Sequence, residues 1–101
     1  MEANYARFMD YKGVKWEYER EILTFPHGAS KIGIVRYIPD FKITLGKTTY
    51  FIEVKGFMDI QDVEKIRLTK RYYPWLKLLL ILPRQYQLIR YYYSKRIPNW
   101  E

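Results

Sequence analysis

Apolar and polar residues alternate along three stretches of the chain, which is the pattern of strands with one buried face. These stretches are residues 14–21, 34–45 and 48–55. The last two flank a Gly-Lys pair, which predicts a hairpin with a two-residue turn. The aliphatic run LKLLLIL at residues 76–82 has no polar face, so we expect an interior strand covered on both faces.

Three further stretches repeat apolar residues at helical spacing, residues 3–13, 59–73 and 84–95. Gly13 is placed to end the first helix, and Asp59 is placed to cap the second, which ends before Pro74. Between the first two strands, residues 22–33 contain a proline and two glycines and predict a loop. The side chains expected to face the core are Tyr5, Phe8 and Met9, then Ile60, Val63 and Ile66, and finally Leu88, Ile89 and Tyr92.

The resulting order is helix, three strands, helix, strand, helix. A helix between the third strand and the aliphatic run allows a parallel crossover, so the sheet should be mixed and four-stranded with helices packed on it. With 101 residues, the chain fits a single α/β domain, residues 1–101.

The hairpin turn fixes which side chains face each other. If Gly46 and Lys47 form the turn, Leu45 pairs with Thr48 and Asp40 lies opposite Glu53. Phe41, Ile43, Tyr50, Ile52 and Val54 then share the inward face, and Asp40, Lys42, Thr49, Glu53 and Lys55 share the other.

Two directly opposed carboxylates repel each other. Asp40 and Glu53 are therefore either solvent-facing strand residues or the ligands of a divalent cation, since Mg²⁺ prefers hard oxygen ligands. Lys55 projects from the same face, where its ammonium could act on a water held by that ion. Two oxygens, an amine and a small metal suffice to hydrolyse a phosphodiester.

The charge of the chain points to a polyanionic partner. The formal net charge is +7, and residues 61–101 hold nine Lys or Arg against three Asp or Glu. Basic residues mixed with tyrosines near the end of the chain suit phosphates and exposed bases. With no cysteine and a single histidine, His27, the chain has no means of forming a disulfide, a thiolate zinc site or a multi-histidine metal site.

The sequence around Asp40, Glu53 and Lys55 resembles the motif of a known nuclease superfamily. Pro39-Asp40, followed by Glu53-Val54-Lys55, resembles the PD-(D/E)XK nuclease pattern, and the predicted order of elements is similar to its core. The longer series WEYE, YIPDF, FIEVKG, YP and L.L is most similar to phage-type endonuclease I, a family that resolves branched DNA such as Holliday junctions. This resemblance covers residues 2–82.

The resemblance implies a restriction-endonuclease-like αβββαβα core and a Mg²⁺- or Mn²⁺-dependent DNA endonuclease. In that case Asp40 and Glu53 bind the metal, Lys55 assists the attacking water, and Glu2 is a further catalytic and metal-binding acid. Glu17 and Glu19 on the neighbouring strand are rivals to Glu2 for that role. The residues expected to contact DNA are Lys65, Arg67, Lys70, Arg71, Arg84 and Arg90.

Symmetric cuts in a junction need two active sites, so we expect a homodimer. In the phage family, residues ahead of the first glutamate interlock the subunits, whereas this sequence starts at Met1-Glu2. The loop from Thr24 to Gly33 could connect two parts of the chain that are exchanged between the subunits of a dimer. Its glycines could equally belong to a compact monomer.

The N-terminus has no signal-peptide pattern and the longest aliphatic run is too short for a membrane span, so we expect a cytoplasmic protein of a phage or prokaryotic host without a membrane partner. The alternatives are a small nuclease for single strands, flaps or nicks, a DNA-binding module without catalysis, and an RNA-cleaving enzyme.

Overall fold

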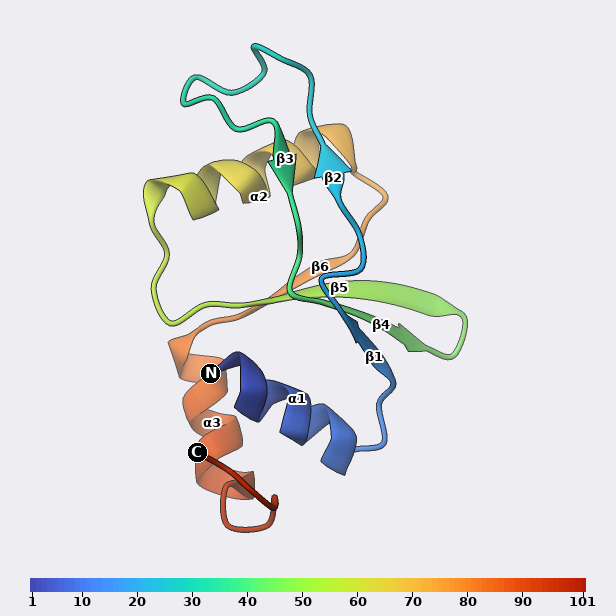
Figure 1. The fold of residues 1–101 in the computed structure, drawn as a ribbon, viewed down its shortest axis with the longest axis vertical. Helices are drawn as coiled ribbons and strands as arrows, with labels where there is room; N and C mark the ends of the chain where they lie inside the picture. The colour runs from blue at the N-terminus through green and yellow to red at the C-terminus, as the bar shows by residue number, and fades with distance from the viewer.

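The computed structural model describes all residues from Met1 to Glu101 and has an α/β architecture (Figure 1). Three helices accompany a mixed four-stranded sheet and a separate two-stranded ribbon. None of the helices has both the length and the apolar character of a membrane span. The elements are α1 (Glu2–Tyr11), β1 (Trp16–Tyr18), β2 (Leu23–Thr24), β3 (Arg36–Tyr37), β4 (Phe41–Leu45), β5 (Thr48–Val54), α2 (Ile60–Tyr72), β6 (Leu78–Ile81) and α3 (Pro83–Tyr93).

The main sheet has the strand order β1-β4-β5-β6. The β1–β4 and β4–β5 pairs are antiparallel, and β6 runs parallel to β5 after the crossover through α2. The register of the β4–β5 hairpin confirms the prediction, because Leu45 pairs with Thr48 and Phe41 pairs with Ile52. Gly46 opens the turn with a φ of 62°, a conformation that glycine adopts without strain.

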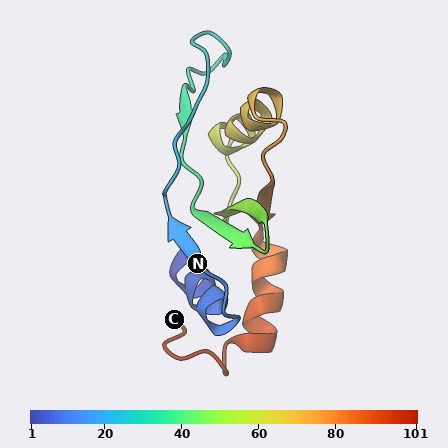
Figure 2. The same cartoon turned by 90° about the vertical axis from the view of Figure 1, so that its right-hand side faces the viewer.

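The elements form three levels along the longest axis of a flat molecule with extents of 47 × 30 × 16 Å (Figures 1 and 2). The sheet lies in the middle, α1 and α3 lie on one side, and α2 lies with the β2–β3 ribbon on the other. Each side has its own core. Six residues pack beneath the sheet, namely Tyr5, Met9, Phe41, Ile43, Ile52 and Val54, and four pack above it, namely Leu23, Phe25, Tyr37 and Leu68.

The predicted helix boundaries are confirmed at the two capped ends. Gly13 follows the end of α1 with a φ of 73°. Asp59 caps α2 in a reciprocal capping box with Asp62, whose main-chain N–H donates to Asp59 Oδ1 at 2.8 Å. The Asp59 N–H in turn donates to Asp62 Oδ2 at 3.1 Å. Such a box satisfies main-chain donors that the first helical turn leaves free.

The predicted inward faces of α2 and α3 are largely wrong. Ile60 is 74% exposed, Val63 is also exposed, and α2 instead buries Leu68 and Thr69. In α3, Leu88 is 54% exposed and Tyr92 is exposed, whereas Tyr86 is buried and Ile89 packs on the core. The reason is that α2 packs through Leu68 against the residues of the β2–β3 ribbon and α3 packs through Ile89 against the core beneath the sheet, and the thin molecule has no second layer to cover their other apolar residues.

Two strand predictions also need correction. The aliphatic run forms β6 at the edge of the sheet, where Leu79 is exposed, so it is not covered on both faces. Residues 34–45 do not form one strand, because the chain leaves the ribbon after Tyr37, passes buried Pro39 and enters the main sheet at Phe41. The predicted loop 22–33 contributes Leu23 and Thr24 to the ribbon.

Helix α1 is held by residues near the other end of the chain. The buried Asn4 side chain donates to the Tyr86 hydroxyl at 2.8 Å and to the main-chain oxygen of Glu101 at 2.9 Å. The Glu101 N–H donates back to Asn4 Oδ1 at 3.0 Å. Gly56 also borders this helix, because a Cβ there would lie 2.9 Å from the sulfur of Met1. These contacts fix where α1 begins.

We expect Leu68→Ala to lower the free energy of unfolding by about 2–5 kcal/mol, because Leu68 is fully buried and its truncation leaves a cavity in the upper core. Leu88→Ala is the matched control on an exposed helical surface and should change stability by less than about 0.5 kcal/mol. Urea unfolding followed by circular dichroism measures both. A larger loss for Leu88→Ala would contradict the helix orientation described above.

Candidate active site

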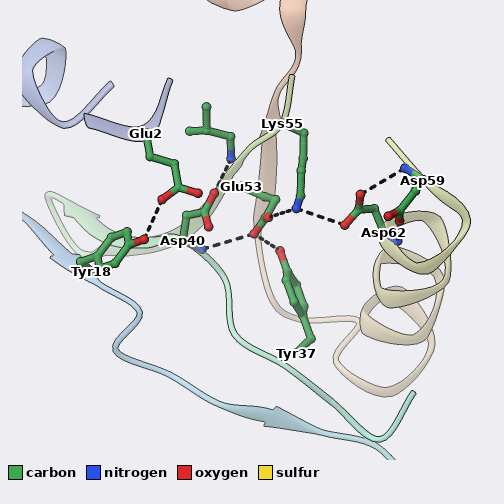
Figure 3. A network of polar contacts seen from close by, with 9 residues as sticks. Glu2, Tyr18, Tyr37, Asp40, Glu53, Lys55, Asp59 and Asp62 are labelled. Carbon is green, nitrogen blue, oxygen red and sulfur yellow. Dashed lines mark hydrogen bonds and ion pairs between the residues drawn. The ribbon is translucent and has the colours of Figure 1, made fainter. Parts of the chain in front are cut away.

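Asp40 and Glu53 meet on the α2 side of the sheet (Figure 3). The Val54 N–H donates to Asp40 Oδ2 at 2.8 Å, and the Asp40 N–H donates to Glu53 Oε1 at 3.3 Å. Asp40 is only 7% exposed and Glu53 only 5%. These residues are therefore not solvent-facing strand residues, and of the two interpretations of their spacing the burial favours a built site.

Glu53 is held by groups from three parts of the chain. Besides the Asp40 N–H, its Oε1 accepts a hydrogen bond from the Tyr37 hydroxyl at 2.6 Å, and its Oε2 lies 3.3 Å from Lys55 Nζ. Burial, followed by the charge of Glu53 and this hydrogen bond, raises the pKa of Tyr37, so the phenol remains a donor. The sequence analysis did not identify Tyr37, because its position depends on the break between β3 and β4.

Lys55 lies between two carboxylates. Its Nζ is 3.3 Å from Glu53 Oε2 and 3.1 Å from Asp62 Oδ1 on the first turn of α2. Burial alone would lower the pKa of Lys55, but the hydrogen bond to Asp62 and the charge of Glu53 outweigh it and raise the pKa. Lys55 is thus a charged, oriented ammonium. The analysis of the sequence recognised Lys55 and missed Asp62, although the acid three residues after the Asp59 cap is a capping-box signal.

The folded protein disfavours the ionised form of Asp40. Burial raises the pKa of Asp40 to about 7, the Val54 N–H opposes this shift, and the charges of Glu53 and Glu2 add to it. A buried anion beside a second anion is costly, and protonation or a cation relieves that cost.

Glu2 approaches this pair from the start of α1, and its carboxylate points toward Asp40 in Figure 3. Its Oε2 accepts a hydrogen bond from the Tyr18 hydroxyl at 2.6 Å, which raises the pKa of Tyr18. Among the rivals, Glu17 pairs with Arg20 at 3.3 Å, and exposed Glu19 contributes a main-chain N–H to the Asp40 carbonyl oxygen. Glu2 is therefore the acid of α1 whose charge acts on Asp40, although it lines a separate hollow with Tyr18 and Phe41.

Asp40, Glu53 and Lys55 open into one hollow of about 290 Å³. Arg36 and Lys65 add two positive charges to its wall, and Tyr37 and Ile38 complete it. Arg36 was not recognised from the sequence. A larger groove, of about 880 Å³, is lined by Glu17 and contains none of the three central residues. The smaller hollow is therefore the place where the predicted chemistry and the shape of the surface coincide.

The other predicted DNA contacts do not gather at this hollow. Arg67 pairs with Glu64 and donates to the Ala29 carbonyl oxygen, so its charge is partly neutralised. Lys70 and Arg71 lie in the last turn of α2. Arg84 and Arg90 line a separate groove on α3, together with Lys95 and Tyr91, on the side of the sheet opposite α2 (Figure 1).

No three His, Cys, Asp or Glu side chains form a metal-binding group in this structure, so Glu2, Asp40 and Glu53 are not gathered into one ligand set. Their chemistry nevertheless suits the Mg²⁺ that the motif implies. Asp40 Oδ1 accepts no hydrogen bond from the protein, and no buried side-chain oxygen lacks a partner, so this oxygen is accessible to solvent. Mg²⁺ commonly takes one or two carboxylates and completes its shell with water and phosphate oxygens.

Comparison with known proteins adds no family assignment. No protein-family model matches the chain, and no curated protein matches it.

In metal-free buffer we expect Asp40→Asn to stabilise the protein at pH 8 by about 1–3 kcal/mol, within the roughly 4 kcal/mol that a shift of three pKa units allows. The pKa of Asp40 rises from 3.8 to about 7 on folding, so the folded state binds this proton more tightly. This group therefore costs stability progressively as pH rises from 4 to 7, and the difference between the variant and the wild type should shrink toward pH 4.

Urea unfolding with a chelator at pH 8 and pH 4.5 measures this difference. Asp59→Asn is the matched control, because asparagine caps helices as well as aspartate and Asp59 is exposed. A destabilised Asp40→Asn variant at pH 8 would show that the two acids do not oppose each other in the folded protein.

Proposed function

We propose that this protein is a Mg²⁺- or Mn²⁺-dependent DNA endonuclease with a restriction-endonuclease-like core, and that it cuts branched DNA. The observation that supports it best is the meeting of Asp40, Glu53 and Lys55 at one hollow, on the register that the hairpin turn sets. Buried acids beside an oriented lysine have little use in a protein that only binds DNA, since acids repel phosphate.

The arrangement of elements also supports the proposal. Apart from the β2–β3 ribbon, the elements follow the order αβββαβα, and such an order with a mixed sheet is what we would expect of a restriction-endonuclease-like core. In this arrangement Asp40 lies just ahead of β4, Glu53 is within β5 and Lys55 follows β5, next to the start of α2. The β2–β3 ribbon adds a wall that supplies Tyr37 and Arg36 to the hollow.

The residues of the hollow suit hydrolysis of a phosphodiester. A divalent ion held by Asp40 and Glu53 would neutralise negative charge and lower the pKa of water. Arg36 and Lys65 would attract and orient the phosphate, and the Lys55 ammonium would stabilise negative charge on the attacking oxygen. Tyr37 would keep Glu53 in place through its hydrogen bond. Glu2 lies near Asp40, where it would bind or orient the water.

The choice of branched DNA comes from the resemblance to phage-type endonuclease I, and the shape of the chain supports the homodimer that paired cuts require. The radius of gyration is 14.7 Å, whereas a compact domain of about 100 residues has about 13 Å. Large apolar side chains are exposed, among them Phe57, Ile60 and Trp75. Such a flat subunit gains from burial against a second copy.

We expect the protein to cut a labelled four-way DNA junction in the presence of Mg²⁺ and to leave it intact with a chelator. The two cuts should be related by the symmetry of the junction, and linear duplex and single-stranded DNA should be cut at least about 10-fold more slowly. Gel analysis of junctions labelled in turn on each strand maps the cuts.

Other outcomes of the same assay identify the alternatives. Equal rates on junction, duplex and single strand, or a preference for flaps or nicks, would contradict selectivity for junctions. Salt-dependent binding without cleavage in Mg²⁺ or Mn²⁺ would indicate a DNA-binding module. Cleavage of RNA in preference to DNA would change the substrate class.

Glu53→Gln and Lys55→Ala should each slow junction cleavage by about 100-fold or more, because the first weakens the metal site and the second removes the ammonium that stabilises the attacking oxygen. Binding of the junction should persist within about 3-fold, since neither residue makes a large contact surface. Single-turnover cleavage and gel-shift titration measure the two effects.

Two matched controls accompany these variants. Glu17→Gln changes an exposed glutamate that pairs with Arg20, and Lys47→Ala changes the exposed turn of the hairpin. Both should cut at the wild-type rate. Cleavage that survives Glu53→Gln and Lys55→Ala together would place the chemistry elsewhere on the molecule.

A further inference from the structure

We propose that Asp62 is the positioning residue for Lys55 and that it aims the lysine at the hollow through the N-terminal cap of α2. This inference rests on the proposed function, since it concerns the lysine of that site. It adds a residue that the motif does not contain and links the reaction centre to a helix end.

The contacts of Asp62 fix it on both sides. Its Oδ1 lies 3.1 Å from Lys55 Nζ, and its Oδ2 accepts the Asp59 N–H at 3.1 Å. The capping box is closed by the Asp62 N–H, which donates to Asp59 Oδ1. The Asp62 side chain is 12% exposed. The first turn of α2 therefore determines the orientation of the Asp62 carboxylate, and this carboxylate in turn sets the position of the Lys55 ammonium (Figure 3).

Glu53 is the only other carboxylate in an ion pair with Lys55, and it has additional partners. Its Oε1 accepts from the Tyr37 hydroxyl and from the Asp40 N–H, and in the proposed function it also faces the cation. A lysine side chain has a flexible stem of about four carbons and loses considerable conformational entropy when it is held in one position. Asp62, in contrast, uses one oxygen for the Asp59 N–H of the helix cap and the other for the Lys55 ammonium. It is therefore the carboxylate that can hold the lysine in place.

Asp62 does not itself face the hollow. The hollow of about 290 Å³ is lined by Lys55 and not by Asp62. Asp62 instead lines a space of only about 10 Å³ behind the lysine, with Met58 and Ile66. Such a space cannot admit a phosphate and is at the lower limit for one water. Asp62 therefore acts on the reaction through Lys55.

The position also explains why an anion is needed there. The amino end of a helix has a partial positive charge, which disfavours a nearby ammonium and favours a carboxylate. Without Asp62, Lys55 would keep Glu53 as its one ion-pair partner and would lose its partner on the first turn of α2, and nearby Lys65 would repel it. We expect the lysine then to leave the hollow for solvent.

The first experiment measures single-turnover cleavage of a labelled four-way junction by the full chain with Mg²⁺. Asp62→Asn keeps an oxygen for the Asp59 N–H and removes the charge, and it should slow cleavage about 10- to 100-fold, the usual effect of losing such a supporting residue. Its dissociation constant for the junction should stay within about 2-fold of the wild type. Asp62→Glu, which suits the same capping box, should recover the rate to within about 5-fold.

Two further variants separate positioning from folding. Asp59→Ala removes the bond from the Asp62 N–H but keeps the main-chain N–H that binds Asp62 Oδ2, so it should lower the urea midpoint and slow cleavage far less than Asp62→Asn does, by at most about 3-fold. In a Lys55→Ala background, Asp62→Asn should cause no further slowing. A wild-type rate for Asp62→Asn, or equal slowing with and without Lys55, would overturn the inference.

Failure of the proposed function gives a different result, namely no cleavage of any nucleic acid by the wild type. In that event the urea unfolding of the wild type, Lys55→Ala, Asp62→Asn and the double variant still tests whether the pair is formed. Coupled changes in the midpoint would support the positioning of Lys55 by Asp62, and additive changes would overturn it.

Discussion

Two buried carboxylates face each other across the β4–β5 pair, and the surrounding structure is arranged to tolerate them. Isolated buried anions are costly, so each must find donors or a positive charge. Asp40 receives the N–H of Val54, and Glu53 receives the Tyr37 hydroxyl and the Lys55 ammonium. These donors come from β3, from β5 and from the residue after β5, so satisfying the two acids also ties the ribbon to the main sheet.

The site lies where the two halves of the molecule meet. The lower core joins α1 and α3 to the sheet, and the upper core joins α2 to the β2–β3 ribbon. Glu2 comes from the lower half, Tyr37 and Lys65 come from the upper half, and Asp40 and Glu53 lie between them. The polar network at their junction therefore links two cores that share no buried apolar residue.

The parts of the fold that local rules determine were predictable from the sequence. A glycine at the turn and strict alternation from Phe41 to Leu45 set the register, and this register predicts that Asp40 lies beside Glu53. The cap at Asp59 and the stop at Gly13 are local in the same sense. The motif residues Asp40, Glu53 and Lys55 follow from that register.

The remaining features depend on distant contacts that periodicity does not encode. In α2, Ile60, Val63 and Ile66 have the spacing of a buried stripe, but Leu68 is the residue that packs into the upper core, with Leu23, Phe25 and Tyr37. Ile60 and Val63 therefore point outward. Tyr37 and Arg36 reach the hollow only because the chain breaks at Pro39, and the exposure of β6 depends on its place at the edge. Arg84 and Arg90 carry the expected charge but lie on the far side of the sheet from α2.

The hydrogen bonds between Asn4 and Glu101 join residues 97 positions apart. Closing so long a segment is entropically unfavourable, and contacts of this separation generally form late in folding. During synthesis, α1 cannot complete its packing until residue 101 has left the ribosome. The β4–β5 hairpin needs no residue beyond Val54, so Asp40 and Glu53 can meet while the helix that carries Glu2 still lacks its last hydrogen bonds.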